Sequence, residues 1–138
     1  MTAEEAIDLI KDAGFGLLAT TEGKQPRVRP MMPFLTDEGE LLVALLGRSR
    51  TIPQIKENPQ VEVCFVDRKM WYCRVTGKAK ISDDKTKKQL LWDAIPMLKQ
   101  YFGGIQDANF VLLQIEVQSA EAMTPHQKQP EKVSLKAA

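Results

Sequence analysis

The stretch from Arg27 to Pro59 places the strongest constraint on how this chain folds. It holds two segments of strand length, Arg27–Leu35 and Glu40–Leu46, separated by a polar turn that contains a glycine. Pro30 and Pro33 lie inside the first segment and remove two backbone donors, so we expect an edge strand or a local bulge there. The sequence therefore predicts a sheet in which this segment is not central.

The rest of the chain alternates between short strands and capped helices. The expected strands are residues 15–21, 27–35, 40–46, 61–66, 71–81 and 110–117. Capping boxes at Thr2 and Thr51 and a cap at Asp84 predict the starts of three helices, and Pro96 should kink or split the last one. About six strands joined mostly by hairpins favour a small antiparallel barrel over a βαβ sheet. We expect a mainly β domain with flanking helices over residues 1–124, and a disordered or loosely packed polar tail over residues 125–138.

Composition narrows the classes of function. The formal net charge of the 138 residues is +1 and only 7% of them are aromatic, which argues against a nucleic-acid binder of the OB type. The longest apolar run, Leu41–Leu46, is too short to cross a membrane, and the acidic start of the chain does not resemble a signal peptide. We therefore expect a cytoplasmic protein that binds neither membranes nor nucleic acid.

The cysteines and the histidine do not predict a metal site. If Val66 pairs with Trp71 in a hairpin, Cys64 falls opposite Cys73. Two interpretations stay open at this point: two buried small hydrophobic residues, or a cross-strand pair that responds to redox conditions. The single histidine, His126, lies in the polar tail, so a multi-histidine metal centre is ruled out.

Two predicted elements converge on a candidate anion site. Period-2 spacing places Arg27, Arg29 and Met31 on one face of their strand. The next strand ends at Leu46 and is followed by a short basic loop, Gly47–Thr51, that leads into a helix. Guanidinium groups, hydroxyls and a helix start together favour binding of a phosphate.

The order of these segments resembles the FMN-binding split-barrel family, which includes pyridoxamine 5′-phosphate oxidase and general stress proteins. Gly23–Met31 is similar to the family hairpin that ends in a phosphate-binding arginine, and Ser49–Pro59 is similar to its Ser-containing motif ending in Asn-Pro. The resemblance implies FMN as cofactor, a homodimer, and a flavin groove to which both subunits contribute. It implies that Arg29 and Ser49 contact the ribityl phosphate, while the backbone of the strand ends lines the isoalloxazine ring. The predicted cofactor-binding residues are Arg27, Arg29, Pro30, Met31, Leu46, Gly47, Ser49, Arg50 and Thr51.

Two departures from the family pattern bear on function. Thr51 stands where the family usually has lysine, so Arg50 or Arg27 would have to supply the missing charge. The segment after Ala120 lacks the tryptophan and arginine that bind substrate in the vitamin-producing oxidases, so pyridoxamine phosphate oxidation is not expected.

Two hypotheses of function remain after these departures. One is a flavin-dependent oxidoreductase of unknown substrate, in which no side chain stands out as a general acid or base. The other is a module that binds or senses flavin, a deazaflavin or haem without turnover. Whether the protein is an enzyme is left open.

Overall fold

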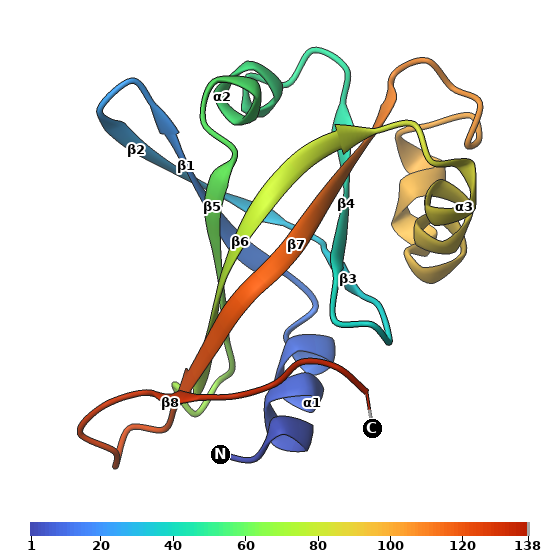
Figure 1. Cartoon of the computed structure of the whole chain (residues 1–138). Helices are drawn as coiled ribbons and strands as arrows, with labels where there is room; N and C mark the ends of the chain where they lie inside the picture. Colours follow the sequence, from blue (N-terminus) through green and yellow to red (C-terminus); the bar gives the residue numbers. More distant parts are fainter. Residues whose placement is uncertain (138) are drawn as a thin grey trace.

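The structure, a computed structural model, describes residues 1–137 (Figure 1). Its strands are β1 (Gly16–Glu22), β2 (Gln25–Met31), β3 (Phe34–Leu35), β4 (Leu41–Leu46), β5 (Gln60–Val66), β6 (Tyr72–Ser82), β7 (Phe110–Met123) and β8 (Glu131–Lys132). Its helices are α1 (Ala3–Ala13), α2 (Thr51–Glu57), α3 (Lys85–Ala94) and the short 3-10 helix η1 (Pro96–Gln100). Within these residues, no helix is long and apolar enough to cross a membrane.

The strands form one antiparallel sheet in the order β2-β1-β5-β6-β7-β4-β3, with β8 added to β7. Its two edge strands, β2 and β3, are joined by only Met32 and Pro33. Because Met31 and Phe34 are three residues apart, their Cα atoms lie within about 10 Å of each other, so the edges must approach. The sheet is accordingly strongly curved in Figure 1. The predicted split antiparallel barrel is confirmed.

The prolines act as expected at the edge, but they also divide the strand. β2 is an edge strand, in agreement with the prediction. The expected continuous strand Arg27–Leu35 was wrong, since β2 ends at Met31 and β3 begins at Phe34. Pro33 cannot donate to a ladder, and the interruption lets the chain pass from one sheet edge to the other.

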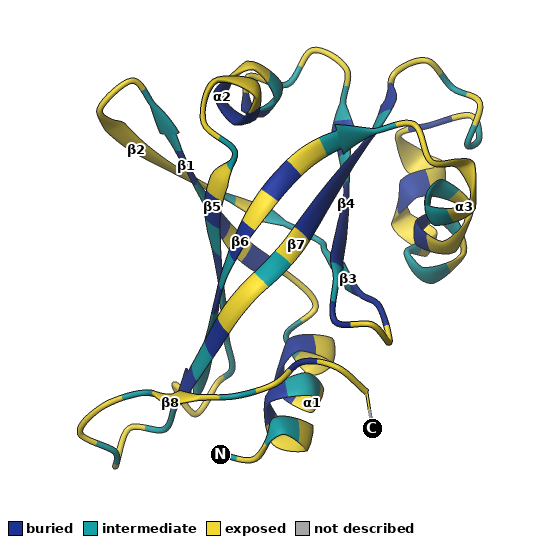
Figure 2. Ribbon diagram, in the orientation of Figure 1, coloured by how far each residue is buried: buried dark blue, intermediate teal, exposed yellow. Residues whose placement is uncertain are grey.

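The interior of the barrel is apolar and α1 packs against it. Buried residues alternate with intermediate or exposed ones along most of β6 (Figure 2). Leu9 and Ile10 of α1 are buried in the same cluster as the inward side chains of the sheet. The predicted capping box is present: the Thr2 side chain accepts from the Glu5 N–H, and the Glu5 side chain accepts from the Thr2 N–H.

A second apolar cluster holds α3 and η1 against the sheet. Leu91 of α3 and Leu98 of η1 are buried with Phe110 and Leu112 of β7. The Phe102 ring stacks on Phe110 with centroids 4.8 Å apart. Pro96 divides the helix as predicted, since α3 ends at Ala94 and η1 starts at Pro96. This packing fixes the segment that follows η1 near the mouth of the site described below.

The predicted register of the hairpin that carries the two cysteines was wrong by one residue. Val66 pairs with Tyr72, so Cys64 lies opposite Arg74 and Cys73 lies opposite Phe65. A one-residue shift sends the two side chains to opposite faces of the sheet. Cys73 is fully buried, and burial raises its pKa to about 12.

Two further expectations need correction. Thr51 is the first residue of α2 and not its cap; the N-cap position is Arg50, which makes no side-chain capping bond. The tail is also better packed than expected, because Leu135 is 4% exposed within the main core. The Ala137 N–H donates to the Asp37 carbonyl over 2.9 Å, which fastens the tail to the β3–β4 turn.

Candidate functional site

Two cavities adjoin at the opening between β2 and the β4–α2 loop. We call the larger one, of about 590 Å³, the apolar cavity, and the smaller one, of about 370 Å³, the basic cavity. Met31 and Ser49 line both. The apolar cavity is also lined by Phe15, Pro30, Met32, Ala44, Leu45, Leu46, Arg48, Leu98, Tyr101 and Phe102. The basic cavity is also lined by Arg27, Val28, Arg29, Arg50, Thr51 and Gln54.

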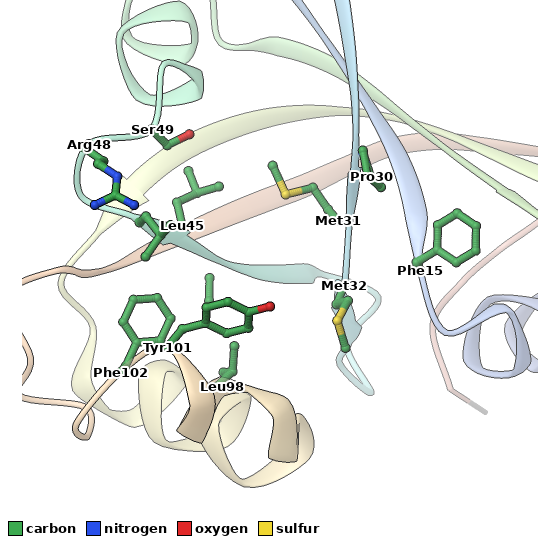
Figure 3. A pocket seen from close by; sticks show the side chains of 12 residues that line it. Phe15, Pro30, Met31, Met32, Leu45, Arg48, Ser49, Leu98, Tyr101 and Phe102 are labelled. Atoms are coloured by element: carbon green, nitrogen blue, oxygen red, sulfur yellow. The ribbon is translucent and has the colours of Figure 1, made fainter.

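The apolar cavity lies between the end of β2 and the η1 segment. Figure 3 shows Met31 and Met32 on one side of the cavity and Tyr101 and Phe102 on the other, with Leu45 of β4 above the aromatic pair in this view. Most of these side chains are hydrocarbon, thioether or aromatic, and the charged group among them is that of Arg48. Such a lining suits a planar, largely apolar ring with a polar edge.

The basic cavity takes Arg27 and Arg29 from one face of β2, and Arg50 from the loop before α2. The register pairs Arg29 with Leu18 and Arg27 with Thr20, so these side chains share a face of the β1–β2 hairpin. The Arg29 guanidinium donates to the Leu18 carbonyl over 3.1 Å and to the Thr20 hydroxyl over 2.7 Å. Partial burial, with a contribution from the nearby charge of Arg27, lowers the pKa of Arg29. An arginine nevertheless stays protonated, so Arg29 is a fixed cation.

Gln54 connects the arginine to the helix. Its side-chain oxygen accepts from Arg29 over 2.6 Å and from the Thr20 hydroxyl over 2.7 Å. Thr20 and Gln54 are both buried, at 2% and 5% exposure. Buried polar groups of this kind hold their partners in one geometry, because each lost bond leaves an unpaired polar atom. Gln54 therefore orients Arg29.

A carboxylate from the end of β1 joins the same group. Glu22 accepts from Arg27 over 3.0 Å, from Arg50 over 3.1 Å and from the Gln54 amide over 3.1 Å. The hydrogen bonds from Arg27, Arg50 and Gln54 lower the pKa of Glu22. The site thus contains its own anion.

The loop before α2 supplies hydroxyls. Ser49 Oγ accepts from the Thr51 N–H over 3.2 Å, and Thr51 is 4% exposed in the first turn of the helix. The Gly47 N–H donates to both the backbone and side-chain oxygens of Asn109, each over 2.9 Å. Its amide is therefore engaged away from the cavities.

All predicted contact residues except Gly47 line one cavity or the other. Sequence reasoning missed Glu22, Gln54 and Thr20, and it missed the aromatic side Tyr101–Phe102. Helical spacing could have indicated Gln54. It lies three residues after Thr51 and one before Ile55, so it falls on the buried face of α2. No local pattern ties residues 101–102 to β2, because that proximity comes from the packing of η1.

Comparison with known proteins gives consistent results. A sequence model of the family described as "Pyridoxamine 5'-phosphate oxidase like" matches residues 2–135. General stress protein 26 of Bacillus subtilis (strain 168) is 27% identical over 139 residues, covering 96% of this chain and 95% of that protein. A crystal structure of a nimC/nimA family protein from Clostridium acetobutylicum has a TM-score of 0.82 at 30% identity, covering 96% of this chain and 92% of that one. The structure of a heme binding protein from Mycobacterium smegmatis has a TM-score of 0.77 at 16% identity, covering 97% of this chain and 58% of that one. At this identity the similarity shows a shared fold alone.

Proposed function

We propose, from the fact that this chain belongs to the pyridoxamine 5′-phosphate oxidase-like family, that it is an FMN-binding flavoprotein. We further propose that it acts as an oxidoreductase on a small molecule other than pyridoxamine phosphate. The observation that carries the proposal is the adjoining pair of cavities, one apolar and one basic, which share Met31 and Ser49. FMN has the same division into a ring system and a phosphate.

The donors in the basic cavity fit a phosphate. Arg27, Arg29 and Arg50 bring three guanidinium groups, which suit bidentate binding of phosphate oxygens, and Ser49 adds a hydroxyl. Arg50 has 77% of its side chain exposed and Arg27 has 47%, so both can turn toward a ligand. With Thr51 buried, these two arginines would supply the charge that the family usually obtains from lysine.

The apolar cavity fits the ring. Met31, Leu45 and Phe102 would exclude water from one side of it, which strengthens the interactions of any polar group at its edge. Arg48 lies at this cavity and would interact favourably with negative charge on the ring. When bound, FMN supplies the electron and hydride chemistry, and the side chains supply position and electrostatics.

We also propose that the protein works as a homodimer. Leu17 and Val28 lie on the outer face of the β1–β2 hairpin with 36% and 62% exposure, and Phe15 beside them has 47%. A second copy would cover this apolar strip on an edge strand, which is otherwise a risk for aggregation.

The test is cofactor content followed by titration. We expect natively purified protein to show a flavin absorption spectrum and to release FMN on denaturation, identified by mass spectrometry. Arg50→Gln should weaken FMN binding by about tenfold or more and leave riboflavin binding nearly unchanged, because it removes a charged donor to phosphate. The matched control is Arg68→Gln, an exposed arginine in the β5–β6 turn.

Turnover separates the enzyme from a binding module. Steady reduction of an electron acceptor by NAD(P)H would support an oxidoreductase, and tight FMN without turnover would support a binding or sensing module. Protein that binds no flavin even when FMN is added would refute the flavin proposal. A haem spectrum in place of a flavin one would instead favour the function named for the Mycobacterium smegmatis protein.

A further inference from the structure

The Glu22 carboxylate lies where donors from three elements meet. Arg27 comes from β2, Arg50 from the loop before α2, and Gln54 from α2 itself. Arg27 donates to Glu22 Oε1 through both Nε, at 3.2 Å, and Nη2, at 3.0 Å. Arg50 Nη2 reaches both carboxylate oxygens, at 3.3 and 3.1 Å. This is the pattern of donors that a bound phosphate would require.

These contacts add little to stability. Glu22 has 38% of its side chain exposed and Arg50 has 77%, and ion pairs between exposed groups are weak because water and salt screen them. The arginines can therefore leave Glu22 for a ligand at small cost. The carboxylate nevertheless remains beside the ligand, where its negative charge opposes that of a phosphate.

The net charge of the cluster can be compared with the charge of a phosphate ligand. Three guanidinium groups and one carboxylate give the Arg27, Arg29, Arg50 and Glu22 cluster a net charge of +2. A phosphate monoester carries a charge of about −1.5 to −2 near neutral pH. Without the carboxylate the cluster would carry one more positive charge against the same ligand.

We propose that Glu22 is a specificity-determining residue of this site. Its carboxylate pairs with Arg27 and Arg50 before a ligand arrives, then competes with the ligand phosphate for them. The native site therefore discriminates less between phosphorylated and unphosphorylated flavin than its three arginines alone would allow. This inference rests on the proposed function, since it concerns the phosphate end of the same site.

The test compares FMN with riboflavin in Glu22→Gln, a substitution that keeps the shape and one acceptor oxygen. Fluorescence quenching of each flavin by apoprotein gives the two Kd values. We expect the FMN Kd to fall by about three- to tenfold, as removal of one nearby like charge in a solvated site predicts, while the riboflavin Kd changes by less than about twofold. The FMN Kd should also depend more steeply on salt in the variant.

Glu121→Gln is the matched control. Glu121 is paired with Arg74 over 2.9 Å and has a similar exposure, 37%, but it lies on β7 away from both cavities. We expect it to leave both Kd values unchanged. Adding Arg50→Gln in the native and Glu22→Gln backgrounds gives a second measurement, and loss of Arg50 should cost more FMN affinity when Glu22 is absent.

The outcomes separate the inference from the proposed function. If native protein binds FMN and Glu22→Gln leaves the FMN Kd unchanged or raises it, the inference is wrong and the proposed function stands. An equal change for riboflavin would also overturn the inference, because the effect would not act on the phosphate. If neither the native protein nor the variant binds either flavin, both the proposed function and the inference about Glu22 are wrong. If only the variant binds FMN, the inference about Glu22 stands and FMN binding by the native protein is refuted.

Discussion

Replacement of Gln54 by methionine tests whether the buried network around Arg29 is as tightly arranged as the distances imply. Methionine keeps the length of the side chain and removes its polar atoms. The change deletes bonds to Arg29 at 2.6 Å, to Thr20 at 2.7 Å and to Glu22 at 3.1 Å. It therefore affects stability and the position of a cation in the candidate site together.

The expected cost follows from the kinds of bond lost. A neutral bond contributes about 1 kcal/mol and a bond to a charged group about 1.5–3 kcal/mol, but Arg29 keeps its contacts with Leu18 and Thr20. We therefore expect a loss of about 2–4 kcal/mol in the free energy of unfolding. For a chain of 138 residues, whose unfolding entropy is about 0.3 kcal/mol/K, this lowers Tm by roughly 7–14 °C.

Urea unfolding followed by circular dichroism measures the change directly. The control is Gln89→Met on α3, where the exposed side-chain amide donates to Asp93 over 2.9 Å. We expect the control to differ from the native protein by less than about 0.5 kcal/mol. If Gln54→Met were equally mild, Gln54 would not be holding Arg29, and the geometry of the basic cavity would need another explanation.

Three further perturbations test other parts of the structure. Leu135→Ala should lower the free energy of unfolding by about 2–3 kcal/mol in urea titrations, because the side chain is 4% exposed, whereas Lys136→Ala on the exposed neighbour should have little effect. Burial raises the pKa of Cys73 from an ordinary 9.0 to about 12, so the unfolded thiol loses its proton before the folded one and stability falls as pH rises between these values. From pH 9 to 11, native protein should therefore lose on the order of 2 kcal/mol more than Cys73→Ala, and equal pH slopes would contradict the buried position. Val28→Lys should shift the sedimentation of the protein from dimer to monomer while Met70→Lys, at a similarly exposed position in the β5–β6 turn, does not; a monomeric native protein would refute the proposed dimer.

The barrel could be predicted because its signals are local. Turn residues mark the hairpins, prolines mark an edge, and alternation marks the buried face, so the six expected strands correspond to seven of the eight described ones, and β8 was missed. The cysteine register could not be predicted, because the turn between β5 and β6 holds one more residue than assumed: Asp67 N–H pairs with the Trp71 carbonyl, and Val66 then faces Tyr72. The packed tail was missed because its larger apolar residues, Val133 and Leu135, are few in a polar segment, where only the tertiary fold provides them with neighbours.

The sequence predicted those site residues that lie together on one strand or loop. Alternation along β2 placed Arg27, Arg29 and Met31 on one face, and the structure brings them to the basic cavity or its border. The aromatic wall at Tyr101 could not be predicted, since packing of η1 against β4 and β7 in the second apolar cluster brings it to the cavity that β2 also lines. Local pattern thus predicted one side of the site, and packing between distant segments supplied the other.

The replacement of the family lysine by Thr51 has a different meaning once Glu22 is considered. From sequence, the loss of one cation suggested a weakened phosphate site. In the folded chain Thr51 is buried, and the exposed Arg50 just before it extends to Glu22. The charge at this end of the cavity is therefore set by a balance of arginines against one carboxylate, brought together from β1, β2 and the loop before α2. Comparison of the Ser49–Pro59 motif with the family pattern reveals a gain or loss of cations within the motif, but not a carboxylate outside it. The carboxylate that offsets them lies 29 residues before Thr51 in the sequence. The hairpin register places it within hydrogen-bond distance of Arg27, and the packing of α2 against β1 brings Arg50 to it.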